Sequence, residues 1–182
     1  MEIDLSVNIG KLKLKNPIMV ASGTFDVGAI HELPLLGAIV TKTITLKPRK
    51  GNPMPRTCET AAGMLNAIGL ENPGIDAFIK EKLPKLLKFG APIIVSIASE
   101  GDPEEFAILA KRLDKIKEIA ALELNISCPN LKTKKLISQC PVSTYEVVKS
   151  VRNVTNKTII TKLSPNVTDI TEIAKAAENA GS

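Results

Sequence analysis

Cys128 is the residue whose type and position in this sequence most suggest chemistry. It follows the apolar run 120–127, in the stretch LELNISCPNLK, with Asn125 before it and Pro129 and Asn130 after it. Free cysteines are often buried, but a structural thiol would lie inside the apolar run and not at the corner beyond it. A thiol can act as a base or a nucleophile where its site favours the thiolate. We therefore interpret Cys128 as the catalytic candidate.

Three asparagines and two lysines could form a binding site around it. Asn66, Asn125 and Asn130 each carry a donor and an acceptor, which suits a planar heterocycle whose edge alternates C=O and N–H. The alternative interpretation is turn chemistry, the usual role of loop asparagines. Lys42 and Lys162 stand at the ends of apolar runs, where an unpaired ammonium is costly to bury. The alternative for each is a side chain that extends to solvent, but together they would suit an anionic ligand or an electron-rich cofactor ring.

The other chemistry-bearing side chains exclude several kinds of site. The cysteines form no CxxC pair, which argues against a disulfide framework, and no metal site is expected. His31 is the single histidine, so a histidine-based triad is excluded. Cys58 and Cys140 are interpreted as structural or incidental. Glu123 lies inside an apolar run, and we expect it to brace the fold by pairing with a cation.

Length and composition favour one globular domain over residues 1–182, with 44% hydrophobic and 24% charged residues. The net charge of +5 comes mostly from lysines on expected helices, which indicates a solvated surface. With 3% aromatic residues there are no stacking platforms, so no nucleic-acid binding is expected. No apolar run is long enough for a membrane span, and the start MEIDLSVNIG lacks the apolar region of a signal peptide. A cytoplasmic location is expected.

Apolar runs alternate with helical patterns along the chain. Each run is short and apolar nearly throughout, which is typical of a parallel strand buried on both faces. Five strand-then-helix units predict an α/β fold with a parallel sheet, either a (β/α)8 TIM barrel or a doubly wound open sheet. The expected strands are 16–22, 37–43, 91–98, 120–127 and 157–164, and the expected helices are 27–36, 74–88, 103–117, 143–154 and 168–180.

Two features favour the barrel. No expected strand is followed by the G-x-G-x-x-G turn of a dinucleotide-binding sheet. Polar residues stand at the carboxyl ends of the expected strands, and a barrel brings all those ends together on one face. These residues are Ser22, Gly23, Lys42, Thr43, Ser96, Asn125 to Asn130, Lys162 and Ser164.

Two further features of the chain bear on its organisation. The segment 46–73 is rich in Pro, Gly, Asn and Thr and too long for an idle connection, so we expect a functional loop. The chain ends at Ser182, after about the first five βα units of a barrel. We therefore expect it to be the amino-terminal part of a longer protein.

Four separated stretches resemble one known family. They are NPIMVASGTF, KPRKGNPMPRTCETAAGMLNAIGLENPG, LELNISCPN and TKLSPNVTDI, in the family's order along nearly the whole chain. They resemble the class 1B dihydroorotate dehydrogenases, in their catalytic, FMN-binding subunit. The Cys of NISCPN is similar to class 1, whereas the membrane-associated class 2 enzymes have Ser there.

The resemblance implies an FMN-dependent TIM barrel that oxidises dihydroorotate to orotate in de novo pyrimidine (UMP) synthesis. Cys128 would be the base that removes the C5 proton while hydride passes from C6 to flavin N5. The implied substrate positions are Lys42, Asn66, Ala67, Ile68, Gly69, Leu70, Asn125 and Asn130. The implied flavin positions are Ser22, Gly23, Lys42, Thr43, Ser96, Asn125 and Lys162, with Lys162 placed to stabilise negative charge on the reduced ring.

The resemblance also implies a homodimer and a second subunit that carries FAD and a [2Fe-2S] cluster and passes electrons to NAD⁺. Three departures stand out: Ser96 replaces a common Asn, the segment LKTKKLISQCP differs from relatives, and the chain ends before the turns that hold the FMN phosphate. Two alternatives stay open. One is a non-catalytic barrel fragment that acts only in assembly with a complementary half, and the other is a related pyrimidine-reducing flavoenzyme.

Overall fold

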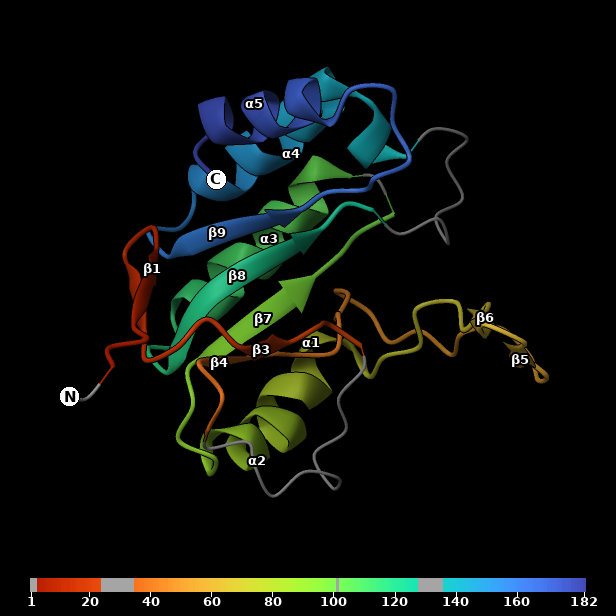
Figure 1. The fold of residues 1–182 in the computed structure, drawn as a ribbon, viewed down its shortest axis with the longest axis horizontal. Coiled ribbons are helices and arrows are strands. Elements are labelled where there is room, and N and C mark those ends of the chain that lie inside the picture. The colour runs from red at the N-terminus through yellow and green to blue at the C-terminus, as the bar shows by residue number, and fades with distance from the viewer. Residues whose placement is uncertain (1–2, 24–34, 101, 128–135) are drawn as a thin grey trace.

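A curved parallel sheet forms the centre of the molecule, for which the computed structural model describes residues 3–23, 35–100, 102–127 and 136–182 (Figure 1). The sheet has five strands, and each coincides with one of the expected apolar runs. The strands predicted from the sequence are therefore confirmed. They are β3 (Met19–Val20), β4 (Ala38–Val40), β7 (Ile93–Ile97), β8 (Ile119–Asn125) and β9 (Thr158–Lys162).

The order of the strands decides between the two architectures. In the sheet they stand as β3-β4-β7-β8-β9, which is also their order along the chain, and every neighbouring pair is parallel. A doubly wound sheet reverses its strand order at a switch point, whereas a barrel adds each new strand beside the previous one. The described sheet is therefore part of a (β/α)8 barrel, and the expectation of a truncated barrel is confirmed.

Helices follow the strands and cover the outer face of the sheet (Figure 1). Asp102 and Asp169 cap α3 and α5, because their side-chain oxygens accept backbone N–H groups of the first helical turn. The expected helices near the carboxyl half of the chain are confirmed, whereas 27–36 lies almost entirely outside the described residues. The described helices in this half of the chain are α3 (Pro103–Asp114), the short 3₁₀ helix η3 (Ile137–Gln139), α4 (Pro141–Arg152) and α5 (Ile170–Ala180).

The expected helix 74–88 is present but is not uniform. It consists of α1 (Gly74–Ala77), a π-helical turn η2 (Phe78–Lys82) and α2 (Leu83–Leu87). Pro84 has no N–H to donate, and its ring crowds the carbonyl of the preceding turn. The widened π turn, which ends two residues before Pro84, accommodates this crowding.

The two faces of the sheet carry different layers, because successive side chains of a strand point to opposite sides. Toward the helices, Val95 and Leu122 pack with Phe106 of α3, all of them fully buried. On the inner face, Ile94 and Ala121 form a separate apolar cluster with Leu14. The inner cluster occupies the amino-terminal half of the strands and leaves their carboxyl ends to polar groups.

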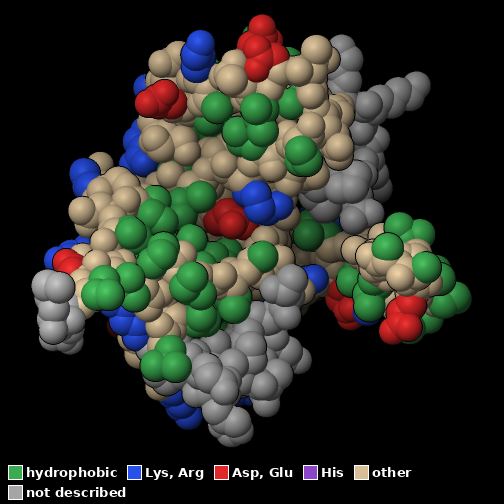
Figure 2. Space-filling view, viewed as in Figure 1, with side chains coloured by type: hydrophobic (Ala, Val, Ile, Leu, Met, Phe, Trp, Pro, Cys, Tyr) green, Lys and Arg blue, Asp and Glu red, His purple; other side chains and the backbone are tan. Residues whose placement is uncertain are grey.

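Leu14 belongs to an antiparallel hairpin, β1 (Val7–Ile9) and β2 (Leu12–Leu14). The hairpin covers the inner apolar cluster and closes that end of the barrel. Figure 2 shows apolar side chains gathered over this region and an acidic and a basic side chain next to one another over the sheet.

The segment 46–73 forms a long ribbon that projects from the sheet (Figure 1). Its tip is the antiparallel hairpin of β5 (Thr57–Thr60) and β6 (Gly63–Asn66), whose residues are all exposed. Backbone pairs continue the ribbon toward the sheet, including Asn52 N–H to Ile68 O at 3.0 Å. Within the described part of the chain, no helix has the length and apolar character that a membrane crossing requires.

Candidate functional site

A polar layer at the carboxyl ends of the strands is built from β8, β9 and the segment after β4. Lys162 ends β9 and lies opposite Asn125, which ends β8. Lys162 Nζ donates to Asn125 Oδ1 at 3.0 Å and to Ser127 Oγ at 2.8 Å. Asn125 Nδ2 donates to Thr43 Oγ1 at 3.1 Å. Three predicted site residues from three parts of the chain therefore form one connected group.

A second polar pair lies one residue before the end of β7 and two residues before the end of β8. Ser96 of β7 and Glu123 of β8 are neighbours in register, and Ser96 Oγ donates to Glu123 Oε1 at 2.8 Å. Ser96 Oγ also lies 2.8 Å from Thr43 Oγ1, which connects this pair to the polar layer. Ser96 is fully buried and Glu123 is 7% exposed. The expectation that Glu123 pairs with a cation is wrong for the described residues, where its partner is a serine hydroxyl and no ion pair includes it.

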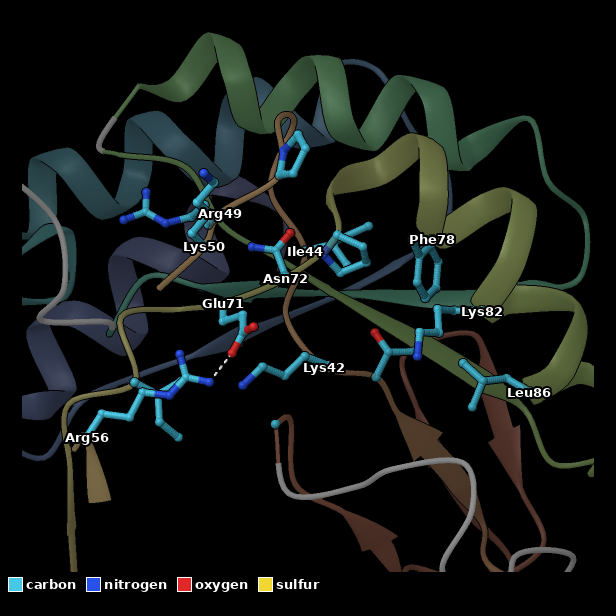
Figure 3. Close-up of a pocket in the computed structure, with 15 residues that line it drawn as sticks. Lys42, Ile44, Arg49, Lys50, Arg56, Glu71, Asn72, Phe78, Lys82 and Leu86 are labelled. Carbon is cyan, nitrogen blue, oxygen red and sulfur yellow. Dashed lines mark hydrogen bonds and ion pairs between the residues drawn. The ribbon is translucent and has the colours of Figure 1, made fainter. Parts of the chain in front are cut away.

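Lys42 extends into a cavity of about 790 Å³ beside the polar layer (Figure 3). The side chain is half-buried, and among the described residues no hydrogen bond or ion pair to its ammonium is found. Gly23 has a φ of +86°, and a Cβ placed there would lie 3.5 Å from Lys42 Nζ. A glycine at this position fits the backbone conformation and keeps the approach to the ammonium open.

Most charged side chains around the cavity are cationic. They are Lys42, Arg49, Lys50, Arg56 and Lys82, against the single carboxylate of Glu71. Arg56 forms an ion pair with Glu71, as Figure 3 shows, and Arg49 forms one with Glu100 at 2.5 Å. The two arginines are thus neutralised within the protein. Lys42, Lys50 and Lys82 are the lining cations that lie outside these two ion pairs.

Asn72 anchors the base of the 46–73 ribbon and was not among the predicted site residues. It is buried, and its Oδ1 accepts from the backbone N–H of Thr45 at 3.1 Å and of Gly74 at 2.9 Å. Its Nδ2 donates to Leu70 O at 2.9 Å and to Thr45 Oγ1 at 3.0 Å. The bond to the residue two positions on is an Asx turn. The Asn-Pro-Gly sequence at 72–74 is the signal that could have identified it.

The structure separates the loop residues that were predicted to bind substrate. Ile68 lines the cavity near Lys42, and Gly69 packs so closely on Asn52 that a Cβ would lie 2.8 Å from its backbone nitrogen. Leu70 is buried against Ala98. Asn66 and Ala67, in contrast, are exposed on and beside β6, on the projecting ribbon.

The remaining predicted residues fall into two groups. Ser22 is half-buried just after β3, beside Gly23. Cys128 and Asn130 lie outside the described residues, so their assigned roles stay predictions. The described chain reaches Ser127, which binds Lys162 at the edge of the polar layer.

These features define a class of protein: an α/β-barrel protein with a hydrogen-bonded polar layer at the carboxyl ends of its strands and a lysine-containing cavity beside it. In barrels of this type that end of the strands carries the active site. The donors and acceptors available there would bind a planar, anionic, oxygen-rich ligand.

Comparison with known proteins places the chain in a particular family. A profile of the family "Dihydroorotate dehydrogenase" matches residues 4–182. The catalytic subunit of dihydroorotate dehydrogenase B (NAD(+)) from Trichlorobacter lovleyi is 53% identical over 186 residues, covering 100% of this chain and 61% of the relative. The same subunit from Geobacter metallireducens is 53% identical over 97% of this chain and 59% of the relative. The chain belongs to the dihydroorotate dehydrogenase family and spans about 60% of the length of these relatives.

A solved structure agrees on the fold. The crystal structure of DHODH in complex with ferulenol from Eimeria tenella superposes with a TM-score of 0.78 at 22% identity, covering 98% of this chain and 57% of that one. At this identity the likeness concerns the fold alone. It supports the partial-barrel topology derived from the strand order.

Proposed function

We propose that this chain is the amino-terminal part, residues 1–182, of an enzyme that oxidises dihydroorotate to orotate in de novo pyrimidine synthesis. The observation that carries the proposal is the position of Lys42. Its ammonium is half-buried in the cavity and has no partner in the described part of the chain. The next residue, Thr43, belongs to the polar layer. An anionic substrate would therefore meet a free cation on one side and a hydrogen-bonding surface on the other.

The substrate chemistry matches these groups. Orotate is a planar ring, and dihydroorotate is puckered at its two sp³ carbons, C5 and C6. Both carry a carboxylate and alternating C=O and N–H groups. A carboxylate at Lys42 would form a charge-assisted hydrogen bond, which is roughly twice as strong as a neutral one. Asn125, and Asn130 beyond the described residues, would pair with the ring edge, because each amide both donates and accepts. Ile68 would add an apolar contact within the same cavity.

The described residues also fit FMN as the cofactor. The edge of a flavin ring carries carbonyl oxygens and two ring nitrogens, N1 and N5, that accept hydrogen bonds, and an N3–H group that donates one. Lys162 has three N–H donors, and two of them are used by Asn125 and Ser127. The third donor and the Thr43 side of the layer would hold the ring edge, with Ser22 and Gly23 beside it. When bound, FMN would accept the hydride from the substrate.

Cys128 would supply the base that removes the C5 proton. It comes three residues after Asn125 and one after Ser127, so the strand that carries the polar layer leads directly to it. General-base catalysis of this kind is typically worth ~10² to 10⁴-fold in rate. The positioning of the ring by Lys42 and Asn125 would supply much of the remainder.

The assembly is proposed from the relatives. They are named as catalytic subunits of an NAD(+)-linked enzyme, which supports a partner subunit for this chain. We propose that this partner carries FAD and a [2Fe-2S] cluster and delivers electrons to NAD⁺. We also propose that the catalytic subunit forms a homodimer and works in the cytoplasm.

The decisive experiment is anaerobic addition of dihydroorotate to the purified native protein loaded with FMN. Bleaching of the flavin band near roughly 450 nm, where oxidised protein-bound flavins absorb, is the expected result for a flavin that accepts substrate hydride. Cys128→Ala should slow the bleaching by ~10² to 10⁴-fold while FMN stays bound. Cys58→Ala is the matched control, because Cys58 is an exposed thiol on β5. A native protein that binds FMN but is not bleached would contradict the proposed reaction.

A further inference from the structure

Five side chains of the site form a hydrogen-bonded chain with a cation at one end and an anion at the other, and Ser127 joins it at Lys162 and Asn125. From Lys162 it runs through Asn125 at 3.0 Å and Thr43 at 3.1 Å. It continues through Ser96 at 2.8 Å and ends at Glu123 at 2.8 Å. The three central members and Glu123 are each at most 7% exposed. Water therefore has little access to replace a hydrogen bond that is lost from this chain.

The direction of this chain follows from counting protons. An ionised carboxylate only accepts, so the single hydroxyl proton of Ser96 goes to Glu123. The close contact between Ser96 and Thr43 then requires Thr43 to be the donor. With its own proton used, Thr43 can only accept from Asn125. The amide of Asn125 therefore directs its NH₂ group to Thr43 and its carbonyl to the ammonium of Lys162.

We propose that Glu123 is a positioning residue that, together with Lys162 at the other end, sets the one-way direction of this chain and so fixes the polarity that Thr43 and Asn125 present at the ligand site. This inference rests on the proposed function, because it assigns Glu123 a role toward the flavin and substrate of that same site. Glu123 itself acts through Ser96 and Thr43. The role differs from the brace expected from the sequence, which required only a nearby cation.

Burial explains why the terminus is a carboxylate. A neutral hydroxyl in place of the Glu123 carboxylate could donate to Ser96 as well as accept from it. Ser96 could then donate to Thr43, and Thr43 to Asn125, so that every hydrogen bond would run in the opposite direction. Reversal would direct a donor at Asn125 and turn its NH₂ group toward the Lys162 ammonium, which is unfavourable. A carboxylate removes that alternative.

Neutron diffraction from deuterated native protein tests the direction of these hydrogen bonds, and it does not require bound FMN. The expected result is a Ser96 hydroxyl deuterium on the line to Glu123 Oε1 and a Thr43 hydroxyl deuterium on the line to Ser96 Oγ. A Thr43 deuterium directed at Asn125 would overturn the proposal. This measurement uses the native side chains, so it does not depend on the folding of any variant.

Two variants test the consequence for the ligand site through the Kd of FMN, measured by quenching of flavin fluorescence. Glu123→Leu removes the acceptor of Ser96, so the Ser96 and Thr43 protons lose their fixed direction. FMN binding should weaken by about tenfold, the size expected for one misdirected hydrogen bond at the ligand site. Glu123→Gln keeps an acceptor oxygen. Because reversal would turn the Asn125 NH₂ group toward Lys162, the Gln carbonyl should still accept from Ser96 and restore FMN binding to within about threefold of the native protein. Glu146→Gln removes one carboxylate from the exposed side of α4 and serves as the charge control.

The outcomes separate this inference from the proposed function. Unchanged FMN affinity in Glu123→Leu, even with a lowered melting temperature, would mean a structural brace and overturn the inference. Equal weakening in Glu123→Leu and Glu123→Gln would also overturn it, because the retained acceptor would then have no effect. A native protein that binds FMN but does not oxidise dihydroorotate would contradict the proposed function alone. If the native protein binds no FMN, the deuterium positions still decide the inference.

Discussion

Lys162 and Asn125 face each other across the last pair of described strands, with Nζ 3.0 Å from Oδ1. The contact joins residues that are 37 positions apart in the sequence. It places a cation at the carboxyl edge of the sheet and orients an amide beside it. The site chemistry proposed above depends on this pair.

Replacement of Lys162 by Met should make the bound flavin harder to reduce. The variant keeps much of the side-chain volume but removes the positive charge that would stabilise the reduced ring, so the midpoint potential should become more negative. Loss of one preorganised electrostatic partner typically costs ~10²-fold or more in rate, and we expect a similar slowing of flavin reduction by dihydroorotate. Stopped-flow absorbance measures the rate. Lys175→Met, on the exposed side of α5, is the control and should leave both quantities unchanged.

Replacement of Lys42 by Met should weaken the binding of orotate. Removing a charge-assisted hydrogen bond to the carboxylate is worth roughly 1.5 to 3 kcal/mol, or a rise in Kd of about 10 to 150-fold. The flavin absorbance change on titration with orotate gives the Kd. Lys47→Met, an exposed lysine in the same segment, controls for the loss of net charge. An orotate Kd equal to that of the control would argue against Lys42 as the carboxylate partner.

Replacement of Asn72 by Ala should loosen the base of the 46–73 ribbon. The variant leaves the buried N–H groups of Thr45 and Gly74 without their acceptor, which costs about 1 to 3 kcal/mol of unfolding free energy. Trypsin should then cleave faster after Lys50 and Arg56. Asn153→Ala, the same truncation at an exposed position after α4, should not change the digestion. Equal cleavage rates in both variants would show that other contacts hold the ribbon.

The amino-terminal cap of α5 should make stability depend on pH in the acidic range. Hydrogen bonds from the side chain and then the backbone of Thr171 lower the pKa of Asp169 from its ordinary value of 3.8. Because the folded state favours the ionised form, the contribution is present above that value and is lost as pH falls through the lowered pKa. Asp169→Asn keeps a good cap but removes the titration.

Thermal unfolding at several pH values measures this effect. The melting temperature of the native protein should exceed that of Asp169→Asn at neutral pH, and the difference should shrink as the solution is acidified. A difference that stays constant down to about pH 2, well below the ordinary pKa range of Asp, would rule out Asp169 as its source.

The sequence alone determined the order of the five parallel strands and of the helices between them, and the approximate places where these strands end, but not the hairpins β1–β2 and β5–β6. A parallel strand buried on both faces must be apolar along its whole length, so 91–98 and 120–127 could be located from local composition. The same apolar pattern also located Asn125 and Lys162 as site residues. The first polar residues at the carboxyl end of such a run mark the edge of the sheet where the site forms. The helix expected at 74–88 is present, but a π-helical turn interrupts it just before Pro84.

The tertiary structure decided which of these polar residues meet. Thr43 contacts Ser96 across 53 positions of sequence and Asn125 across 82, and such contacts depend on strand register and sheet curvature that no local pattern encodes. For the same reason Glu123 has a serine partner where a cation was expected. Asn66 lies exposed on the projecting ribbon and Asn72 is buried at its base. Residue type alone could not distinguish these two asparagines, because only the folded backbone provides the N–H groups that Asn72 binds.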